Sequence, residues 1–324
     1  MASAVVGYTG GLSGAAWDNL VETAYDRQVE YYLRDQPQWM QLIDKRPAQQ
    51  AMPGDTITLT LHNPFAALAT TPLTESTDPD AVAAAAPTRV NVVMNEYGNA
   101  AITTLRLRDL GFTKPDAEIA RLIGFNMADS IDQIIRSVAD AGTNLLFLNG
   151  GVMKTSGGTL NGILATDIMG RNVATVSVKL LQRAKTLPRM GSYYVGVIHP
   201  DVAYDLQAEN SATAWNAPHT VGGDTQAIYS GVIGSLQGAT YVETTRTTFA
   251  NNTATTPVRV YNTYYFGRQA LVQAVAEMPH TVVGPQTDKL KRFFPIGWYS
   301  LMGNAIYRSA ALVTAQTASS IAAL

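Results

Sequence analysis

Apolar residues recur at intervals of three and four positions between Thr113 and Leu148, which predicts one long amphipathic helix over residues 113–148. Polar residues fall on its opposite side, and among them Asp132 and Arg136 have the i,i+4 spacing of a helical ion pair. The run Asn149-Gly150-Gly151 ends the pattern. The predicted apolar stripe consists of Ala120, Ile123, Met127, Ile131, Ile134, Val138, Ala141 and Leu145.

Two short segments, residues 55–62 and 90–94, alternate between apolar and polar positions, which is typical of half-buried strands. The 25 residues between them, Asn63 to Pro87, contain four prolines. A loop of that length is usually functional, and two strands alone are not stable in water. The sequence therefore predicts an extended arm that packs on a partner surface, for which another copy of the chain is the natural candidate.

The remaining pattern mixes helices and strands, which predicts an α+β fold. The run 193–198 is apolar at almost every position, as in a strand buried on both faces, and a short helix follows it. In the last part of the chain, residues 278–285 and 293–302 contain Pro and Gly, which we expect to interrupt the strands there. The other expected helices are 15–33, 173–187 and 202–208, and the other expected strands are 101–107, 239–245, 258–266, 271–276 and 304–314.

The composition points to a covered surface. Charged residues make up only 15 % of the 324 residues, and hydrophobic residues make up 46 %. Because the centres of protein interfaces are poor in charge, a large subunit interface accounts for this balance. The net charge of −2 gives no overall attraction to nucleic acid or to an anionic membrane. There is no cysteine, which excludes disulfides and thiolate metal sites, and we expect no membrane-spanning segment.

A search for catalytic motifs finds one weak candidate, in which His199, Asp201 and Asp205 follow the predicted buried strand. These residue types could bind a metal or serve acid–base chemistry, but His-Pro-Asp at a strand end is also an ordinary helix start. No paired-histidine zinc motif, glycine-rich phosphate loop or nucleophile elbow is present. The sequence therefore predicts no cofactor, no metal and no enzyme.

One compact basic and aromatic patch is present, formed by Lys289, Lys291 and Arg292 with two following phenylalanines. It could meet phosphates, or it could form salt bridges with a neighbouring subunit, which we prefer. The N-terminal aromatic residues suit packing better than base stacking, because no basic groove accompanies them.

The order of these parts resembles the Hong Kong 97-type fold of tailed-bacteriophage major capsid proteins, and more narrowly the family typified by the major capsid protein of phage N4. The likeness spans nearly the whole chain, in the order of its motifs more than in any single one. The residues that carry it are Glu96-Tyr97-Gly98-Asn99, His199-Pro200-Asp201, Tyr204-Asp205-Leu206, the run 233–245, Gly297-Trp298, Ile306 and Arg308.

The resemblance implies a division into parts. These would be an N-terminal arm with a helix (1–50), an extended loop (51–100), a peripheral domain with the long spine helix (101–159 and 276–324) and an axial domain (160–275). The extended loop would lie over a neighbouring subunit, and the N-terminal arm would also contact neighbours. The expected contact residues are Phe65, Leu68, Leu73, Glu75 and Val82 in the loop, and Trp17, Tyr25 and Tyr32 in the arm.

The resemblance also implies a function: a shell subunit that forms pentamers and hexamers around double-stranded DNA, located in the virion and assembled in the host bacterial cytoplasm. Expected partners are a separate scaffolding protein, a portal, a decoration or cement protein, and packaged DNA through nonspecific contacts. Two alternatives remain open at this point. One is a cellular nanocompartment shell of the same fold, and the other is a metal-dependent hydrolase that uses His199, Asp201 and Asp205.

Overall fold

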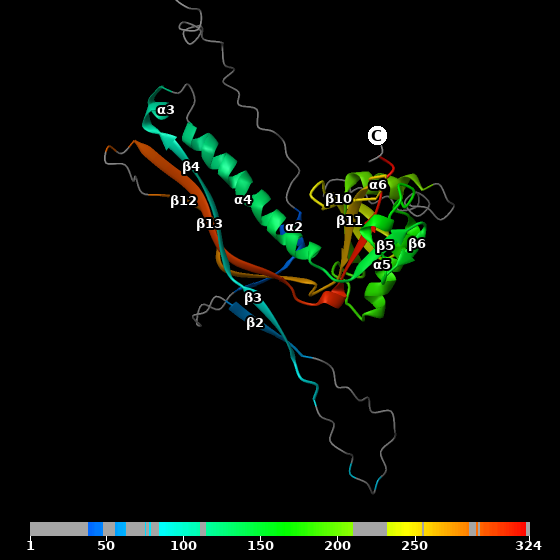
Figure 1. Cartoon of the computed structure of the whole chain (residues 1–324). Helices are drawn as coiled ribbons and strands as arrows, with labels where there is room; N and C mark the ends of the chain where they lie inside the picture. The colour runs from blue at the N-terminus through cyan, green and yellow to red at the C-terminus, as the bar shows by residue number, and fades with distance from the viewer. Residues whose placement is uncertain are drawn as a thin grey trace, which may run out of the picture.

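The computed structural model describes residues 38–47, 56–62, 75, 78, 84–110, 115–209, 232–254, 256–284, 290 and 292–321. The predicted N-terminal helix over residues 15–33 lies outside them. The structure contains a large mixed sheet, a long narrow sheet with one long helix running along it, and a two-stranded ladder that leads away from both (Figure 1). Within the described residues, no helix is long and apolar enough to cross a membrane.

The large sheet has eight strands and two covered faces. Its order is β6-β5-β14-β11-β7-β9-β8, with β10 paired to β11. Side chains of β7 point alternately to the two faces: Tyr194 and Ile198 join the core cluster of α5 and α6, whereas Val195 and Val197 join that of α2 and α4. This confirms the prediction of a strand buried on both faces. The strands are β5 (Leu145–Asn149), β6 (Val152–Lys154), β7 (Tyr194–Ile198), β8 (Val232–Leu236), β9 (Ala239–Glu243), β10 (Phe249–Asn251), β11 (Arg259–Phe266) and β14 (Leu312–Thr317), and the helices are α2 (Trp39–Leu42), α4 (Pro115–Asp140), α5 (Arg171–Arg183) and α6 (Pro200–Ala208).

The long sheet has four strands in the order β1-β12-β13-β4, and α4 runs along it (Figure 1). Its strands are β1 (Asp44–Pro47), β4 (Asn95–Thr104), β12 (Leu271–Val283) and β13 (Phe293–Ile306), and the short helix α3 (Leu105–Leu110) follows β4. The expected interruptions at Pro and Gly do not break β12 or β13. Instead, the register of β12 against β13 shifts twice, between Val275 and Glu277 and between Glu277 and His280. The second irregularity contains Pro279, which cannot donate a ladder hydrogen bond.

The last expected strand, over residues 304–314, is wrong in its bounds. Residues up to Ile306 belong to β13, a 3-10 turn (Ser309–Ala311) follows, and β14 begins at Leu312. The two strands lie in different sheets, so this turn carries the chain from the long sheet back to the large one.

The long helix α4 is confirmed, but its predicted end at Leu148 is wrong. It ends at Asp140, and residues 145–149 form β5, which pairs in parallel with β14. Gly142 marks the end, since a Cβ there would lie 2.9 Å from a side-chain carbon of Leu312. The Asn144 amide then donates to the carbonyl oxygens of Ser309 and Leu312 at 2.6 and 3.3 Å, which fixes the start of β5 beside its partner.

The two strands of the predicted arm, β2 (Thr56–Leu61) and β3 (Thr88–Val93), pair antiparallel as expected. The sequence predicts that this ladder depends on another molecule for its stability. That prediction is incomplete, because the two strands pack on the long sheet of the same chain. Ile57, Leu59, Val90 and Val92 contact a cluster on the long sheet that includes Val272. The Tyr307 hydroxyl donates to the Thr60 carbonyl oxygen at 3.3 Å. For the part of the arm beyond these strands, most of which lies outside the described residues, a partner surface stays a prediction.

Candidate interaction surfaces

The three candidate metal or acid–base residues lie at the start of α6 and have structural partners. His199 is the N-cap residue, and its Nδ1 accepts a hydrogen bond from the backbone N–H of Asp201 at 3.2 Å. Its ring also packs against the ring of Tyr261, with 4.8 Å between centroids. Burial lowers the pKa of His199, although the Asp201 carboxylate acts in the opposite direction. His199 therefore serves as the cap of α6.

The two carboxylates of this group hold other parts of the chain in place. Asp201 accepts a hydrogen bond from the Tyr261 hydroxyl at 2.5 Å. Asp205 accepts hydrogen bonds from the backbone N–H of Ser320, at 3.1 Å, and from its hydroxyl. No group of three or more metal-ligating side chains occurs among the described residues. The two carboxylates therefore connect Tyr261 of β11 and Ser320 to α6.

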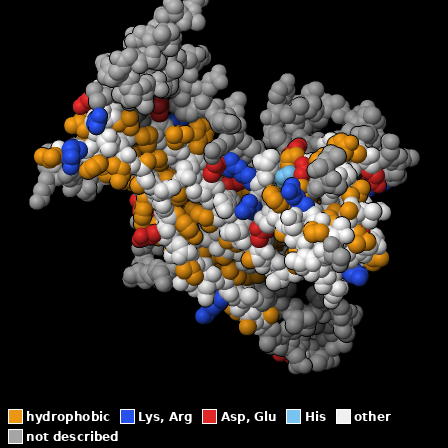
Figure 2. Space-filling view, turned by 45° about the horizontal axis from the view of Figure 1, so that its top comes forward, with side chains coloured by type: hydrophobic (Ala, Val, Ile, Leu, Met, Phe, Trp, Pro, Cys, Tyr) orange, Lys and Arg blue, Asp and Glu red, His pale blue; other side chains and the backbone are white. Residues whose placement is uncertain are grey.

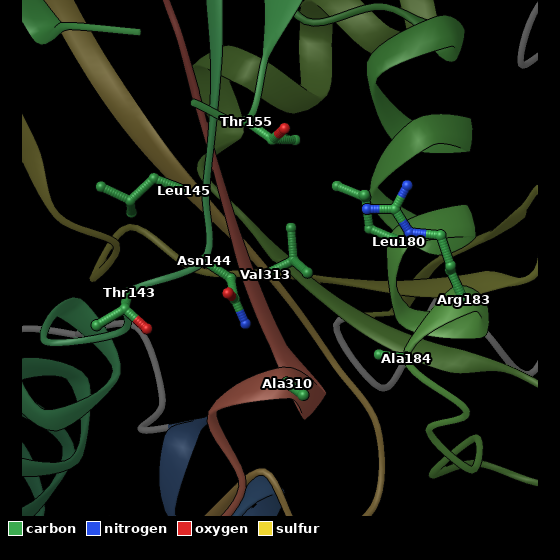
Figure 3. A pocket seen from close by; sticks show the side chains of 9 residues that line it. All are labelled: Thr143, Asn144, Leu145, Thr155, Leu180, Arg183, Ala184, Ala310 and Val313. Atoms are coloured by element: carbon green, nitrogen blue, oxygen red, sulfur yellow. The ribbon is translucent and has the colours of Figure 1, made fainter. Parts of the chain in front are cut away.

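A pocket of about 260 Å³ lies between the C-terminal end of α5 and the start of β5 (Figure 3). Arg183 is the one charged side chain among the residues that line it, beside Thr143, Asn144 and Thr155. The Asn144 amide already donates to two carbonyl groups. Acid–base catalysis needs a titratable group placed to exchange a proton with a substrate, and an isolated guanidinium does not supply one.

A cluster of charges joins α4 to the large sheet. Arg246, which follows β9, has its Nη2 2.6 Å from Asp129 Oδ1 and its Nη1 3.7 Å from Asp132 Oδ2. Arg136 Nη1 donates to the carbonyl oxygen of Arg246 at 3.3 Å. One turn further along α4, Asp140 accepts hydrogen bonds from Thr248, Asn262 and Tyr264. These contacts fix the C-terminal half of α4 on the large sheet.

The predicted position of Asp132 on the polar side of α4, paired with Arg136, is wrong. Asp132 is fully buried, and its Oδ1 accepts a hydrogen bond from the backbone N–H of Trp39 at 2.8 Å. Burial raises the pKa of Asp132, while the Trp39 N–H and the charge of Arg246 lower it by smaller amounts. The sequence pattern missed this because α2 packs on this side of the helix and the charged partner lies on another element.

The end of the long sheet next to α3 exposes apolar side chains. On the face shown in Figure 2, hydrophobic side chains gather over the part of the molecule that contains α4 and this sheet. Phe125 on α4 is 46 % exposed and Ile102 on β4 is 64 % exposed. Exposed apolar side chains that gather in one region are typical of an interaction site. Further exposed members are Leu105, Leu107, Leu122, Val283, Leu290 and Phe293.

Most of the predicted contact residues lie outside the described residues. These are Trp17, Tyr25 and Tyr32 of the arm, Phe65, Leu68, Leu73 and Val82 of the loop, and Lys289 and Lys291 of the basic patch. Of the remaining two, Glu75 is exposed, and Arg292 is exposed with its guanidinium 5.5 Å from the ring centre of Phe293. Both Glu75 and Arg292 therefore lie at the surface, and their contacts with a neighbouring subunit stay a prediction.

The sequence matches one known protein family. The sequence profile of the family described as phage capsid protein matches residues 21–311. The chain belongs to the phage capsid protein family. No curated protein sequence matches it.

Similar solved structures support the fold of this phage capsid protein. The capsid of Ralstonia phage GP4 has a TM-score of 0.72 at 13 % identity and covers 92 % of this chain and 95 % of its own. The capsid of Helicobacter pylori bacteriophage KHP30 has a TM-score of 0.66 at 12 % identity, covering 94 % and 97 %. The capsid of Cyanophage Pam1 has 0.64 at 13 % identity, covering 92 % and 98 %. The Hong Kong 97-type fold predicted from the sequence agrees with these likenesses.

The family assigns the chain its general role. It is a structural major capsid protein rather than an enzyme, it associates with copies of itself in a shell, and it resides in the virion capsid. The nanocompartment and hydrolase alternatives are not favoured. The apolar, exposed end of the long sheet is the kind of surface such an assembly covers.

Proposed function

We propose that this protein is the major capsid protein of a tailed phage of the N4-like family, and that it forms pentamers and hexamers of an icosahedral shell around double-stranded DNA. The observation that carries the proposal is the two-stranded ladder β2–β3. Its base is fixed on the long sheet by Val92 and Tyr307, and Glu75 and Asp78 beyond it are exposed. When the strands at the base of a loop are fixed in this way, the loop can contact a neighbouring subunit while the fold of its own subunit stays intact.

The predicted division into parts is retained in this proposal. An N-terminal arm (1–50) and an extended loop (51–100) contact neighbours. A peripheral domain (101–159 and 276–324) contains α4, and an axial domain (160–275) lies near the capsomer centre. The long sheet with α4 along it supports a separate peripheral domain. The large sheet crosses the proposed boundary, because it combines β7 to β11 of the axial domain with β5, β6 and β14 of the peripheral domain.

The contacts with neighbours would involve the residues expected from the sequence, and Arg292 at the exposed apolar end would pair across a subunit boundary. The partners would be a separate scaffolding protein, a portal and a decoration or cement protein, and assembly would take place in the host bacterial cytoplasm. With a net charge of −2, contacts with packaged DNA would be few and independent of base sequence.

Negative-stain electron microscopy and mass photometry of the purified protein test the proposal, first alone and then after co-expression with the scaffolding protein from the same phage. We expect closed shells, tubes, or discrete pentamers and hexamers. A protein that stays monomeric or dimeric under both conditions would contradict the proposal. Shells isolated from infected cells should contain double-stranded DNA, and shells filled with a folded protein cargo would favour a nanocompartment instead.

A further inference from the structure

A groove of about 710 Å³ lies where the chain passes from the large sheet to the long sheet. It is formed by α2 and β1, by the loop before β7, and by the turn between β11 and β12. Four cationic side chains and one carboxylate line it: Lys45, Arg46, Arg189, Arg268 and Asp44. In a chain with a net charge of −2, this is a local concentration of positive charge.

The single carboxylate of the groove is already engaged. Asp44 Oδ1 lies 2.7 Å from Arg189 Nη1, and its Oδ2 accepts the backbone N–H of Gln269 at 2.9 Å. Among the described residues, no carboxylate lies within ion-pair distance of Lys45, Arg46 or Arg268. Within the part of the chain that the structure describes, the groove therefore presents three cations without a carboxylate partner.

Arg46 is held by a neighbouring ring, and Arg268 lies in a turn that Asp44 stabilises. The Arg46 guanidinium lies 5.0 Å from the ring centre of Tyr307, a cation–π contact. Arg268 sits in a turn whose next residue, Gln269, has a φ of 59°, a conformation that is unfavourable for residues other than glycine. Asp44 stabilises that turn through the Gln269 N–H. Backbone strain kept by a specific contact is characteristic of functional positions.

A segment of complementary charge lies on the extended arm. Residues 47–88 contain no Lys or Arg, but Glu75, Asp78 and Asp80 fall within six positions of one another. Glu75 and Asp78 are exposed. The strands β2 and β3 lead away from both sheets (Figure 1), and half of the 25 residues from 63 to 87 spans up to about 40 Å when extended. That reach is comparable to the diameter of a domain of this size.

We propose that the acidic segment of one subunit, centred on Glu75 and Asp78, docks in the cationic groove of a neighbouring subunit. This inference rests on the proposed function and names the surface that receives the loop. Three carboxylates would then face three cations. Such charge pairs contribute more to the position of the docked loop than to its binding affinity. DNA is the less favoured occupant, because duplex binding uses a broad series of phosphate contacts and this groove offers a narrow group of three.

Disulfide trapping tests the proposal directly, since the chain contains no cysteine. Particles of the parent chain are assembled first, so that a failure at this step counts against the proposed function alone. The double variant Glu75→Cys with Arg268→Cys is then assembled and oxidised. We expect covalent multimers on a non-reducing gel, up to closed rings. The matched control is Glu75→Cys with Tyr204→Cys, whose second site is 55 % exposed on α6, outside the groove, and it should remain monomeric.

A charge exchange covers the case in which the cysteine pair fails to assemble. Lys45→Glu with Arg268→Glu should lower the particle yield by about tenfold, and adding Glu75→Lys with Asp78→Lys should restore most of it. Intact particles without cross-links between Glu75→Cys and Arg268→Cys, or with links only within one chain, would overturn the proposal. So would Lys45→Gln with Arg268→Gln particles that form at normal yield but retain less DNA, a result that assigns the groove to nucleic acid.

Discussion

The carboxylate of Asp132 and the guanidinium of Arg246 lie 3.7 Å apart and join α4 to the segment that follows β9. The Asp132 side chain is 1 % exposed, and that of Arg246 is 19 % exposed. Arg246 also meets Asp129, at 2.6 Å, near the surface. The long helix is therefore fixed to the large sheet by charges as well as by its apolar stripe.

Removing this cation should destabilise the subunit strongly. Arg246→Ala leaves the Asp132 carboxylate buried without its counter-charge, and we expect a loss of about 3 kcal/mol of unfolding free energy. Urea unfolding of the unassembled subunit measures it. The matched control, Asp129→Asn, removes the more exposed partner and should cost at most about 1 kcal/mol. Equal losses in the two variants would mean that Asp132 does not depend on Arg246.

The raised pKa of Asp132 predicts a pH dependence. Because burial makes the folded-state pKa higher than the unfolded value of 3.8, the folded state holds this proton more tightly. Its contribution to stability is therefore fully present below pH 3.8 and declines as pH rises through the folded-state pKa. Asp132→Asn, which cannot titrate, is the reference. The stability of the parent chain relative to this variant should fall with rising pH, and a rise would contradict the assignment.

Two glycines of the α4 region should respond in opposite ways to alanine. At Gly124, within α4, a Cβ would meet nothing within 4 Å, and Gly124→Ala should stabilise the subunit by about 1 kcal/mol through helix propensity. At Gly142 the same Cβ lies 2.9 Å from Leu312 and 3.1 Å from the Ala139 carbonyl oxygen. Gly142→Ala should therefore destabilise it by about 2 kcal/mol. Thermal unfolding of both variants measures the difference.

Deleting Asn63 to Pro87 should separate folding from assembly. The described contacts of β2 and β3 with the long sheet lie outside the deleted segment, so a short turn in its place should leave a folded monomer. Without the loop we expect no shells by electron microscopy. Circular dichroism and thermal unfolding check the fold. An unfolded monomer would show that the segment belongs to the core, and normal shells would show that it is dispensable for assembly.

The spacing of apolar residues along the chain was enough to predict the elements that are buried along their whole length. Tyr194–Ile198 is apolar on both faces, and both faces of the sheet are covered by helices. It failed at the end of α4, where Leu145 continues the helical spacing while Leu146 and Leu148 follow the alternation of a strand. The pairing of this segment with Thr314, Ala315 and Gln316 decides between the two, and those partners lie about 170 positions away in the chain.

The interaction surfaces were predictable only where their residues are neighbours in the sequence. Glu75 could be identified from the acidic, proline-rich loop that contains it. The cationic groove could not, because Lys45, Arg189 and Arg268 come from three distant parts of the chain and only the crossing between the sheets brings them together. Asp132 was misplaced for the same reason, since its partners lie on α2 and beyond β9.

The place of β14 has a consequence for the order of synthesis. This strand lies inside the large sheet, between β5 and β11, although it is the last strand of the described chain. A nascent chain therefore cannot close the sheet before residue 317 has left the ribosome, and until then β5 and β11 each keep an unpaired edge. Closure pairs residues almost 170 positions apart, which makes it a slow step. Chains that end before β14 would therefore lack the closed large sheet.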